Sequence, residues 1–104
     1  MELRGRFSQH YSIMRSNSKK KGISFDLGVE DFEKILKLQG GRCYYSGIEL
    51  GIGDSFIQRR DVSMGYTISN SIIVSGFVYK MKGLLSNDDF IGTVRKIYNY
   101  YKIG

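Results

Sequence analysis

This 104-residue sequence contains one histidine and one cysteine, so it offers few candidates for histidine-based or cysteine-based chemistry. His10 is the one histidine, and we treat it as a candidate general base, with a surface or phosphate-contacting position as the alternative. Cys43 is the one cysteine, which excludes an intrachain disulfide and leaves a cysteine-based zinc site without its usual partners. We therefore expect Cys43 to be a small buried residue.

Basic side chains are the largest group that could bind a ligand. Sixteen Lys and Arg against ten Asp and Glu give a net charge of +6, which favours polyanionic partners such as nucleic acid. Residues 1–22 hold one acid and six cations, namely Arg4, Arg6, Arg15, Lys19, Lys20 and Lys21. Because neutralised phosphates release counterions, this basic helical arm could supply sequence-independent affinity. The alternative is a solvated basic terminus without a partner.

The composition predicts one globular domain, residues 1–104. Apolar residues make up 41% of the chain and charged residues 25%, which is ordinary for a folded domain. No apolar run approaches the roughly 20 residues of a membrane-spanning helix, and the N-terminal sequence is too polar for a signal peptide. We expect a soluble intracellular chain with no membrane partner.

The first half of the sequence predicts helices separated by one short strand. Apolar residues recur at near-helical spacing over 2–18, and then alternate with polar ones over 23–27 as in a half-buried strand. A second helix is predicted from Val29 until Gly40 and Gly41 end it. Glycines and the aromatic pair of the following segment indicate a knuckle-like turn.

The second half predicts a hairpin followed by two helices. Strands are expected over 56–61 and 66–74, joined by a turn at 63–65, and a short helix over 76–85. Ser86 is a good N-cap for the last helix. Its apolar stripe predicts that at least two of its tyrosines pack into the core, from the set Tyr98, Tyr100 and Tyr101. The fold class is α+β.

Several segments in this order resemble small phage-type HNH endonucleases. The matching segments are 20–27, 43–47, 57–61, 65–66, Asn70, 81–82 and 85–90. Each segment is a weak signal alone, whereas their order and spacing cover nearly the whole chain. The resemblance implies a ββα core, formed by a β-hairpin and a short helix, flanked by N-terminal helices and a C-terminal helix.

The resemblance also implies a metal site that this sequence does not complete. In the resembled family a carboxylate on the first strand and an Asn or His on the closing helix hold a divalent metal, and a His activates water. Here Gln58 stands at the carboxylate position, Arg59 at the histidine position and Tyr79 at the closing-helix position. A neutral amide is a poor Mg²⁺ ligand, and a guanidinium cannot act as a base. We expect no metal, no zinc and no confidently catalytic residue.

Two further family positions have expected structural roles. Asp61 should point away from Gln58, because strand residues alternate between faces, and should begin the turn. Asn70 matches a family residue whose implied role is to fix the loop through backbone hydrogen bonds. The remaining groove residues are expected to bind nucleic acid without a metal, because phosphate contacts need only cationic donors. The cations expected around the groove are Arg59, Arg60, Lys80 and Lys82.

Three functions remain open from the sequence. The leading one is a phage-encoded, catalytically degenerate HNH-fold protein that binds nucleic acid, with DNA the expected form, in the cytoplasm of a bacterial host. The second is an active Mg²⁺-dependent endonuclease or nickase in which Gln58 or Asp61 helps to hold the ion. The third is a phage interaction module or inhibitor that binds a host protein or its own copy.

Overall fold

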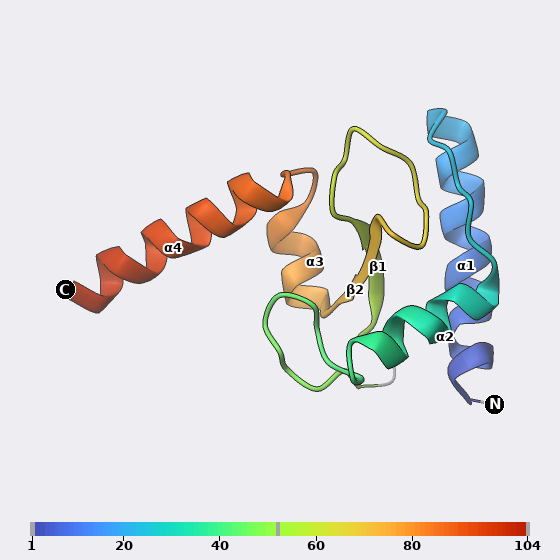
Figure 1. Cartoon of the computed structure of the whole chain (residues 1–104), viewed down its shortest axis with the longest axis horizontal. Helices are drawn as coiled ribbons and strands as arrows, with labels where there is room; N and C mark the ends of the chain where they lie inside the picture. The colour runs from blue at the N-terminus through green and yellow to red at the C-terminus, as the bar shows by residue number, and fades with distance from the viewer. Residues whose placement is uncertain (1, 52, 104) are drawn as a thin grey trace.

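The described residues form four helices and one antiparallel pair of strands, so the predicted α+β class is confirmed (Figure 1). The computed structural model describes residues 2–51 and 53–103, with side chains described for 11–51 and 53–102. The elements are α1 (Glu2–Lys21), α2 (Val29–Leu38), β1 (Phe56–Arg59), β2 (Ser71–Val74), α3 (Gly76–Lys82) and α4 (Asn87–Ile103). None of the helices described is both long and apolar enough to cross a bilayer.

The hairpin is buried on both faces, because alternate residues of each strand enter different clusters. Ile57 pairs with Ile73, and both lie in a cluster with residues of α1 and α2. Ile72 and Val74 point to the other face and pack with Cys43, α3 and the start of α4. Burial on both faces explains why Ser71 of β2 is followed by three consecutive apolar residues rather than by an alternating pattern.

The helix α1 packs on α2 through an aromatic contact. The Tyr11 ring lies 5.5 Å from that of Phe25 and 5.8 Å from that of Phe32, measured between centroids. Such tilted and edge-to-face arrangements are favourable for aromatic pairs. The helix continues to Lys21, three residues beyond the predicted end, and Gly22 follows with a positive φ of 71°.

The predicted strand over 23–27 is wrong, because this segment has only one bridge to the rest of the chain. Phe25 and Tyr66 form an isolated parallel bridge, with the Tyr66 amide donating to the Ser24 carbonyl at 2.8 Å. A Cβ on Gly65 would lie 2.6 Å from the same carbonyl oxygen. A glycine is therefore required beside this bridge.

The second strand of the predicted hairpin, expected over 66–74, is shorter than expected. Only Ser71–Val74 pairs with β1, and the preceding residues form a turn in which the Asn70 amide donates to the Thr67 carbonyl. The Asn70 side chain then holds the hairpin loop, as predicted. Its amide nitrogen donates to the carbonyls of Asp61 and Gly65, and its oxygen accepts from the Asp61 amide.

The outer edge of β2 is closed by a side chain rather than by a third strand. At the C-terminal end of α2, the Gln39 amide donates to the Ile73 carbonyl at 2.9 Å and accepts from the Ile73 amide at 2.9 Å. The Tyr44 backbone amide donates to the same carbonyl. A buried strand edge must have its polar groups paired, and Gln39 provides both partners.

The segment between α2 and β1 begins with the predicted knuckle-like turn. The Cys43 amide donates to the Ile48 carbonyl at 2.8 Å, and the Gly47 amide donates to the Cys43 carbonyl at 3.0 Å. Gly47 has a φ of 73°, which glycine adopts without strain. Cys43 is buried as expected, and its sulfur accepts from the Ser75 amide.

The last helix does not pack as its sequence predicts. Ser86 caps it as expected, with its hydroxyl accepting from the Asp89 amide. After its first turns α4 extends away from the rest of the chain (Figure 1), so the prediction that at least two of its tyrosines enter the core is wrong. Their exposed side chains are those of Tyr98, Tyr100 and Tyr101. An apolar stripe identifies the face of a helix but not whether anything covers it.

We predict that Asn70→Ala lowers the free energy of unfolding by about 2 kcal/mol, because three partly buried backbone groups lose their partner. Urea unfolding measures the change. The matched control is Ser69→Ala, since Ser69 is exposed and its hydroxyl meets only that of Thr67. Equal effects of the two substitutions would contradict the role given to Asn70.

Candidate nucleic-acid interface

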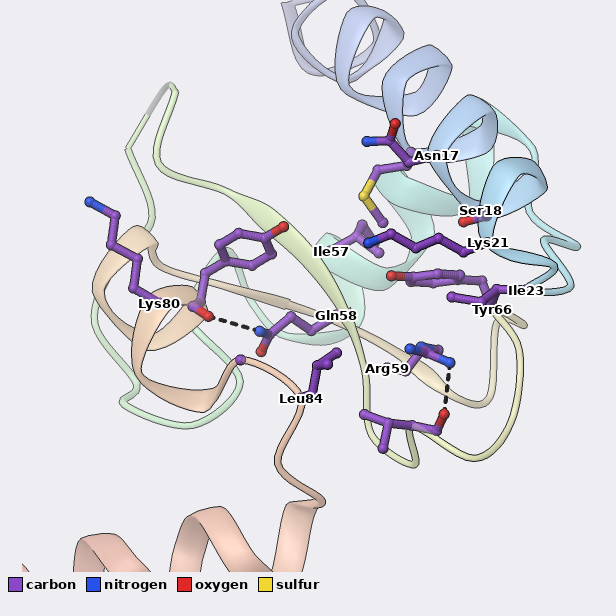
Figure 2. A pocket seen from close by; sticks show the side chains of 14 residues that line it. Asn17, Ser18, Lys21, Ile23, Ile57, Gln58, Arg59, Tyr66, Lys80 and Leu84 are labelled. Carbon is purple, nitrogen blue, oxygen red and sulfur yellow. Dashed lines mark hydrogen bonds between the residues drawn. The ribbon is translucent and has the colours of Figure 1, made fainter.

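A groove of about 590 Å³ crosses β1 between α1 and α3. Figure 2 shows it from close by, with α1 on one side and α3 on the other. Its described lining combines apolar, aromatic and polar side chains, and the charged residues among them are all cationic. The charged and aromatic lining residues are Lys21, Arg59, Tyr66, Tyr79 and Lys80.

One face of α1 forms a wall of the groove. Met14, Asn17, Ser18 and Lys21 follow one another at steps of three, one and three residues, which places them on one side of a helix. Met14 and Ser18 are buried, whereas Lys21 is exposed and faces β1 across the groove (Figure 2). Lys21 is therefore the one cation of the last turn of α1 that lines the groove.

Gln58 is buried in β1 beside α3, with 6% of its surface exposed. Its amide nitrogen donates to the Tyr79 carbonyl at 3.0 Å, which ties β1 to α3 (Figure 2). Its amide oxygen is buried and has no hydrogen-bond partner. Gln58 thus holds α3 in place against β1.

Two tyrosines give the groove its aromatic surface. Tyr79 stacks on Phe56 with ring centroids 5.0 Å apart and an angle of 26° between the rings. The Arg59 guanidinium lies over the Tyr66 ring at 5.3 Å from its centroid, a cation–π contact. Burial raises the pKa of Tyr66 above its ordinary value.

Arg59 has a structural task in addition to its place in the groove. Its Nη1 nitrogen donates to the carbonyls of Val62 and Met64, at 2.8 and 3.0 Å. These bonds hold the hairpin loop against β1. The guanidinium still lines the groove, and its charge cannot be removed near neutral pH.

The groove does not fit the divalent metal that the resemblance implies. The residues described as lining it include no carboxylate and no histidine. Nowhere in the described part of the chain do three or more His, Cys, Asp or Glu side chains gather as metal ligands. A neutral Gln58 and the phenol of Tyr79 do not replace the charged oxygen ligands that Mg²⁺ prefers.

Asp61 begins the hairpin loop, as predicted, and its carboxylate forms hydrogen bonds within that loop. Its carboxylate accepts from the Ser63 hydroxyl at 2.6 Å and from the Ser63 amide at 3.0 Å. These two hydrogen bonds lower the pKa of Asp61. Asp61 lines a second hollow with Asn70 and Asp88, and not the groove that contains Gln58.

The prediction that Lys82 contacts phosphate is wrong, because its side chain is buried with 1% of its surface exposed. Its ammonium donates to the Arg59 carbonyl at 3.0 Å and to the Leu85 carbonyl at 2.7 Å. Burial, with the nearby Arg59 guanidinium, lowers the pKa of Lys82. Lys82 connects the end of α3 to β1 and is not available to a ligand.

The other predicted cations are distributed over different surfaces. Arg60 does not line the groove; it is exposed near the Tyr44 ring, 5.9 Å from its centroid. Lys80 lines the groove from α3 but extends away from Gln58 (Figure 2). On α1 the exposed cations outside the groove are Arg15, Lys19 and Lys20.

Three predicted residues lie outside the described side chains. Arg4, Arg6 and His10 belong to the first half of α1, whose backbone is described. Their parts in phosphate binding or base catalysis stay predictions.

Sequence reasoning missed Asn17 and Tyr66 as groove residues. Asn17 could have been found from its helical spacing to Lys21. Tyr66 could not, because its position depends on the bridge to Phe25 between segments distant in the sequence.

The chain is similar to one viral protein. It is 28% identical over 95 residues to an uncharacterized protein of Acanthamoeba polyphaga mimivirus. The alignment covers 91% of this chain but only 17% of the relative, so the chain spans a small part of that protein's length. No protein-family profile and no solved structure matches the chain.

We predict that Lys82→Met lowers the free energy of unfolding by about 2 kcal/mol, because two partly buried carbonyls lose a charged donor. The control is Lys80→Met on the exposed side of α3, which should have almost no effect on stability. Thermal unfolding of both variants makes the comparison. A stable Lys82→Met variant with weakened nucleic-acid binding would show that Lys82 is a ligand contact after all.

Proposed function

We propose that the chain binds DNA along the groove between α1 and α3 and does not cut it. The order of its elements supports this, because a knuckle-like turn, a hairpin and a short helix follow one another as in the resembled HNH core. On this proposal β1, β2 and α3 correspond to the ββα unit. The mimivirus relative carries no functional information that bears on the choice.

The observation that carries the proposal is the sign of the charge in the groove. Lys21, Arg59 and Lys80 line it, and the described lining includes no acid. Cationic donors without neighbouring carboxylates attract phosphates, since no fixed negative charge offsets them. Exposed Arg15, Lys19 and Lys20 on α1 extend the positive surface beyond the groove.

Binding without cleavage follows from the side chains at the expected metal positions. Gln58 uses its amide to hold the Tyr79 carbonyl, and the nearby carboxylate of Asp61 is engaged by Ser63. A hydrolytic step would need a base and a means to stabilise the leaving oxygen. The described groove residues include donors and aromatic rings, which position a backbone without activating water.

Binding to a short DNA duplex should depend steeply on salt and on the groove lysines. We predict that Lys21→Gln with Lys80→Gln weakens affinity several-fold at low salt. Each phosphate contact that is lost should reduce the slope of log K against log salt by about 0.9. Fluorescence anisotropy of a labelled duplex between about 50 and 200 mM salt measures both quantities.

The control for this experiment removes equal charge elsewhere. Lys34→Gln with Lys37→Gln neutralises two exposed lysines of α2 that do not line the groove. If this pair weakens binding as much as the groove pair, the affinity comes from net charge and the assignment of the groove is wrong.

The wild-type chain should leave supercoiled plasmid intact in Mg²⁺ or Mn²⁺. Gln58→Asp with Tyr79→Asn should create a Mn²⁺ site that titration calorimetry detects and that the wild type lacks. Nicking by the wild type that EDTA abolishes would refute binding without cleavage. A folded double variant that binds no Mn²⁺ would refute the correspondence with the HNH metal site, and circular dichroism establishes that it is folded.

A further inference from the structure

A second hollow, of about 450 Å³, lies along the outer edge of β2, and we refer to it as the β2 cleft. It is formed by the end of α2, the segment 42–47 with the knuckle-like turn, the hairpin loop and the start of β2. Its volume is within the range of sites that take small molecules. No described residue lines both this cleft and the groove between α1 and α3, so the two hollows are separate.

Ser71 directs two backbone groups toward the β2 cleft. In an antiparallel pair, the backbone groups of successive residues point alternately toward the partner strand and away from it. Those of Ile73 point away from β1, because the Gln39 side chain pairs with both of them. The amide and carbonyl of Ser71, two residues earlier in the same strand, therefore point to the same outer side. Neither group has a hydrogen-bond partner within the described part of the chain.

The Ser71 side chain is also without a partner. Ser71 lines the β2 cleft with only 5% of its surface exposed, and its buried hydroxyl makes no hydrogen bond with any described residue. Buried polar groups in folded proteins are nearly always paired. Three unpaired polar groups of one residue beside a cleft therefore indicate that a ligand supplies their hydrogen bonds.

Such a ligand must offer an acceptor and a donor side by side. The planar carboxamide of Gln39 offers this pair to Ile73, with both hydrogen bonds at 2.9 Å. The open amide and carbonyl of Ser71 need the same pair from a ligand. Nucleobases carry an acceptor next to a donor on their edges, and so do the peptide groups of an extended strand. Both kinds of ligand are therefore chemically able to pair with Ser71.

The length of the open edge favours a base over a peptide strand. A strand that adds to a sheet pairs with several residues along the edge. Here the next outward-facing residue, Ile73, is already paired with Gln39 and with the Tyr44 amide. On the other side, the residues before Ser71 form a turn. The described edge thus has room for one planar group beside Ser71, and not for a strand.

The rings and charges of the β2 cleft fit the remaining parts of a nucleotide. Arg42 and Arg60 line it and are exposed, whereas the described lining includes no carboxylate. The Arg60 guanidinium lies over the Tyr44 ring, 5.9 Å from its centroid. Unpaired bases stack on aromatic rings and guanidinium planes, and guanidinium groups bind phosphate. Buried Ile35 and Ile72 add apolar surface for a flat ring.

We propose that the β2 cleft binds one unpaired nucleotide. The edge of its base pairs with the amide and carbonyl of Ser71, and its phosphate contacts Arg42 and Arg60. The nucleotide is free or belongs to a single strand, because the bases of a duplex are already paired and stacked. This site does not rest on the function proposed for the groove, since the two share no lining residue.

Nuclear magnetic resonance of the ¹⁵N-labelled chain tests the site with three probes. Single-stranded hexadeoxyadenylate should move the Ser71 amide resonance downfield, because this amide becomes a hydrogen-bond donor. An abasic strand of the same length has the same phosphates and should leave that resonance in place. Adenosine monophosphate identifies the source of the nucleotide. Weaker binding than that of the strand indicates a strand segment, whereas equal or tighter binding indicates a free nucleotide.

The two arginines and the Ser71 hydroxyl are tested by substitution. Arg42→Gln with Arg60→Gln should weaken hexadeoxyadenylate binding several-fold. The control, Arg95→Gln with Lys96→Gln, removes equal charge from exposed positions of α4 outside the cleft and should have little effect.

Ser71→Ala should also weaken binding several-fold, yet should not lower the midpoint of urea unfolding, because the hydroxyl has no partner among the described residues. A hydroxyl with a purely structural role would give the opposite result.

Several results would overturn the proposal. One is a Ser71 resonance that responds equally to the abasic strand, and another is one that responds to none of the three probes. Equal loss of binding in the two double variants would show that the affinity comes from net charge. A Ser71 response to a tetra-alanine peptide, with none to the nucleotides, would assign the edge to a peptide strand instead. The backbone spectrum of each variant verifies that it is folded.

Discussion

The structure depends on satisfying the outer backbone groups of a sheet with only two strands. Such a sheet has two edges and no third strand to pair with either. Gln39 pairs with both backbone groups of Ile73 on the β2 edge, and Lys82 donates to the Arg59 carbonyl on β1. Because unpaired polar groups are costly when buried, these two side chains allow a small hairpin to lie inside the molecule.

The same constraint determines what the groove can do. Lys82 and Gln58 both tie α3 to β1, one through the Arg59 carbonyl and the other through the Tyr79 carbonyl. Two polar side chains next to the groove are thus used to hold the helix and are not free to bind a ligand. The groove that remains is cationic and aromatic, which suits a phosphate backbone and does not suit a divalent ion.

The sequence by itself determined the helices, the hairpin and the N-cap at Ser86, because these depend on neighbours within about ten residues. The loop-fixing role of Asn70 was expected only from the family resemblance, and its hydrogen bonds agree with it. It also identified the net positive charge. Only the tertiary structure decided which cations line the groove. Lys82 is buried, whereas Lys21 faces the groove, although both lie in the last turn of a helix. Periodicity places a side chain on a face, but only the packing of distant segments determines whether that face is covered.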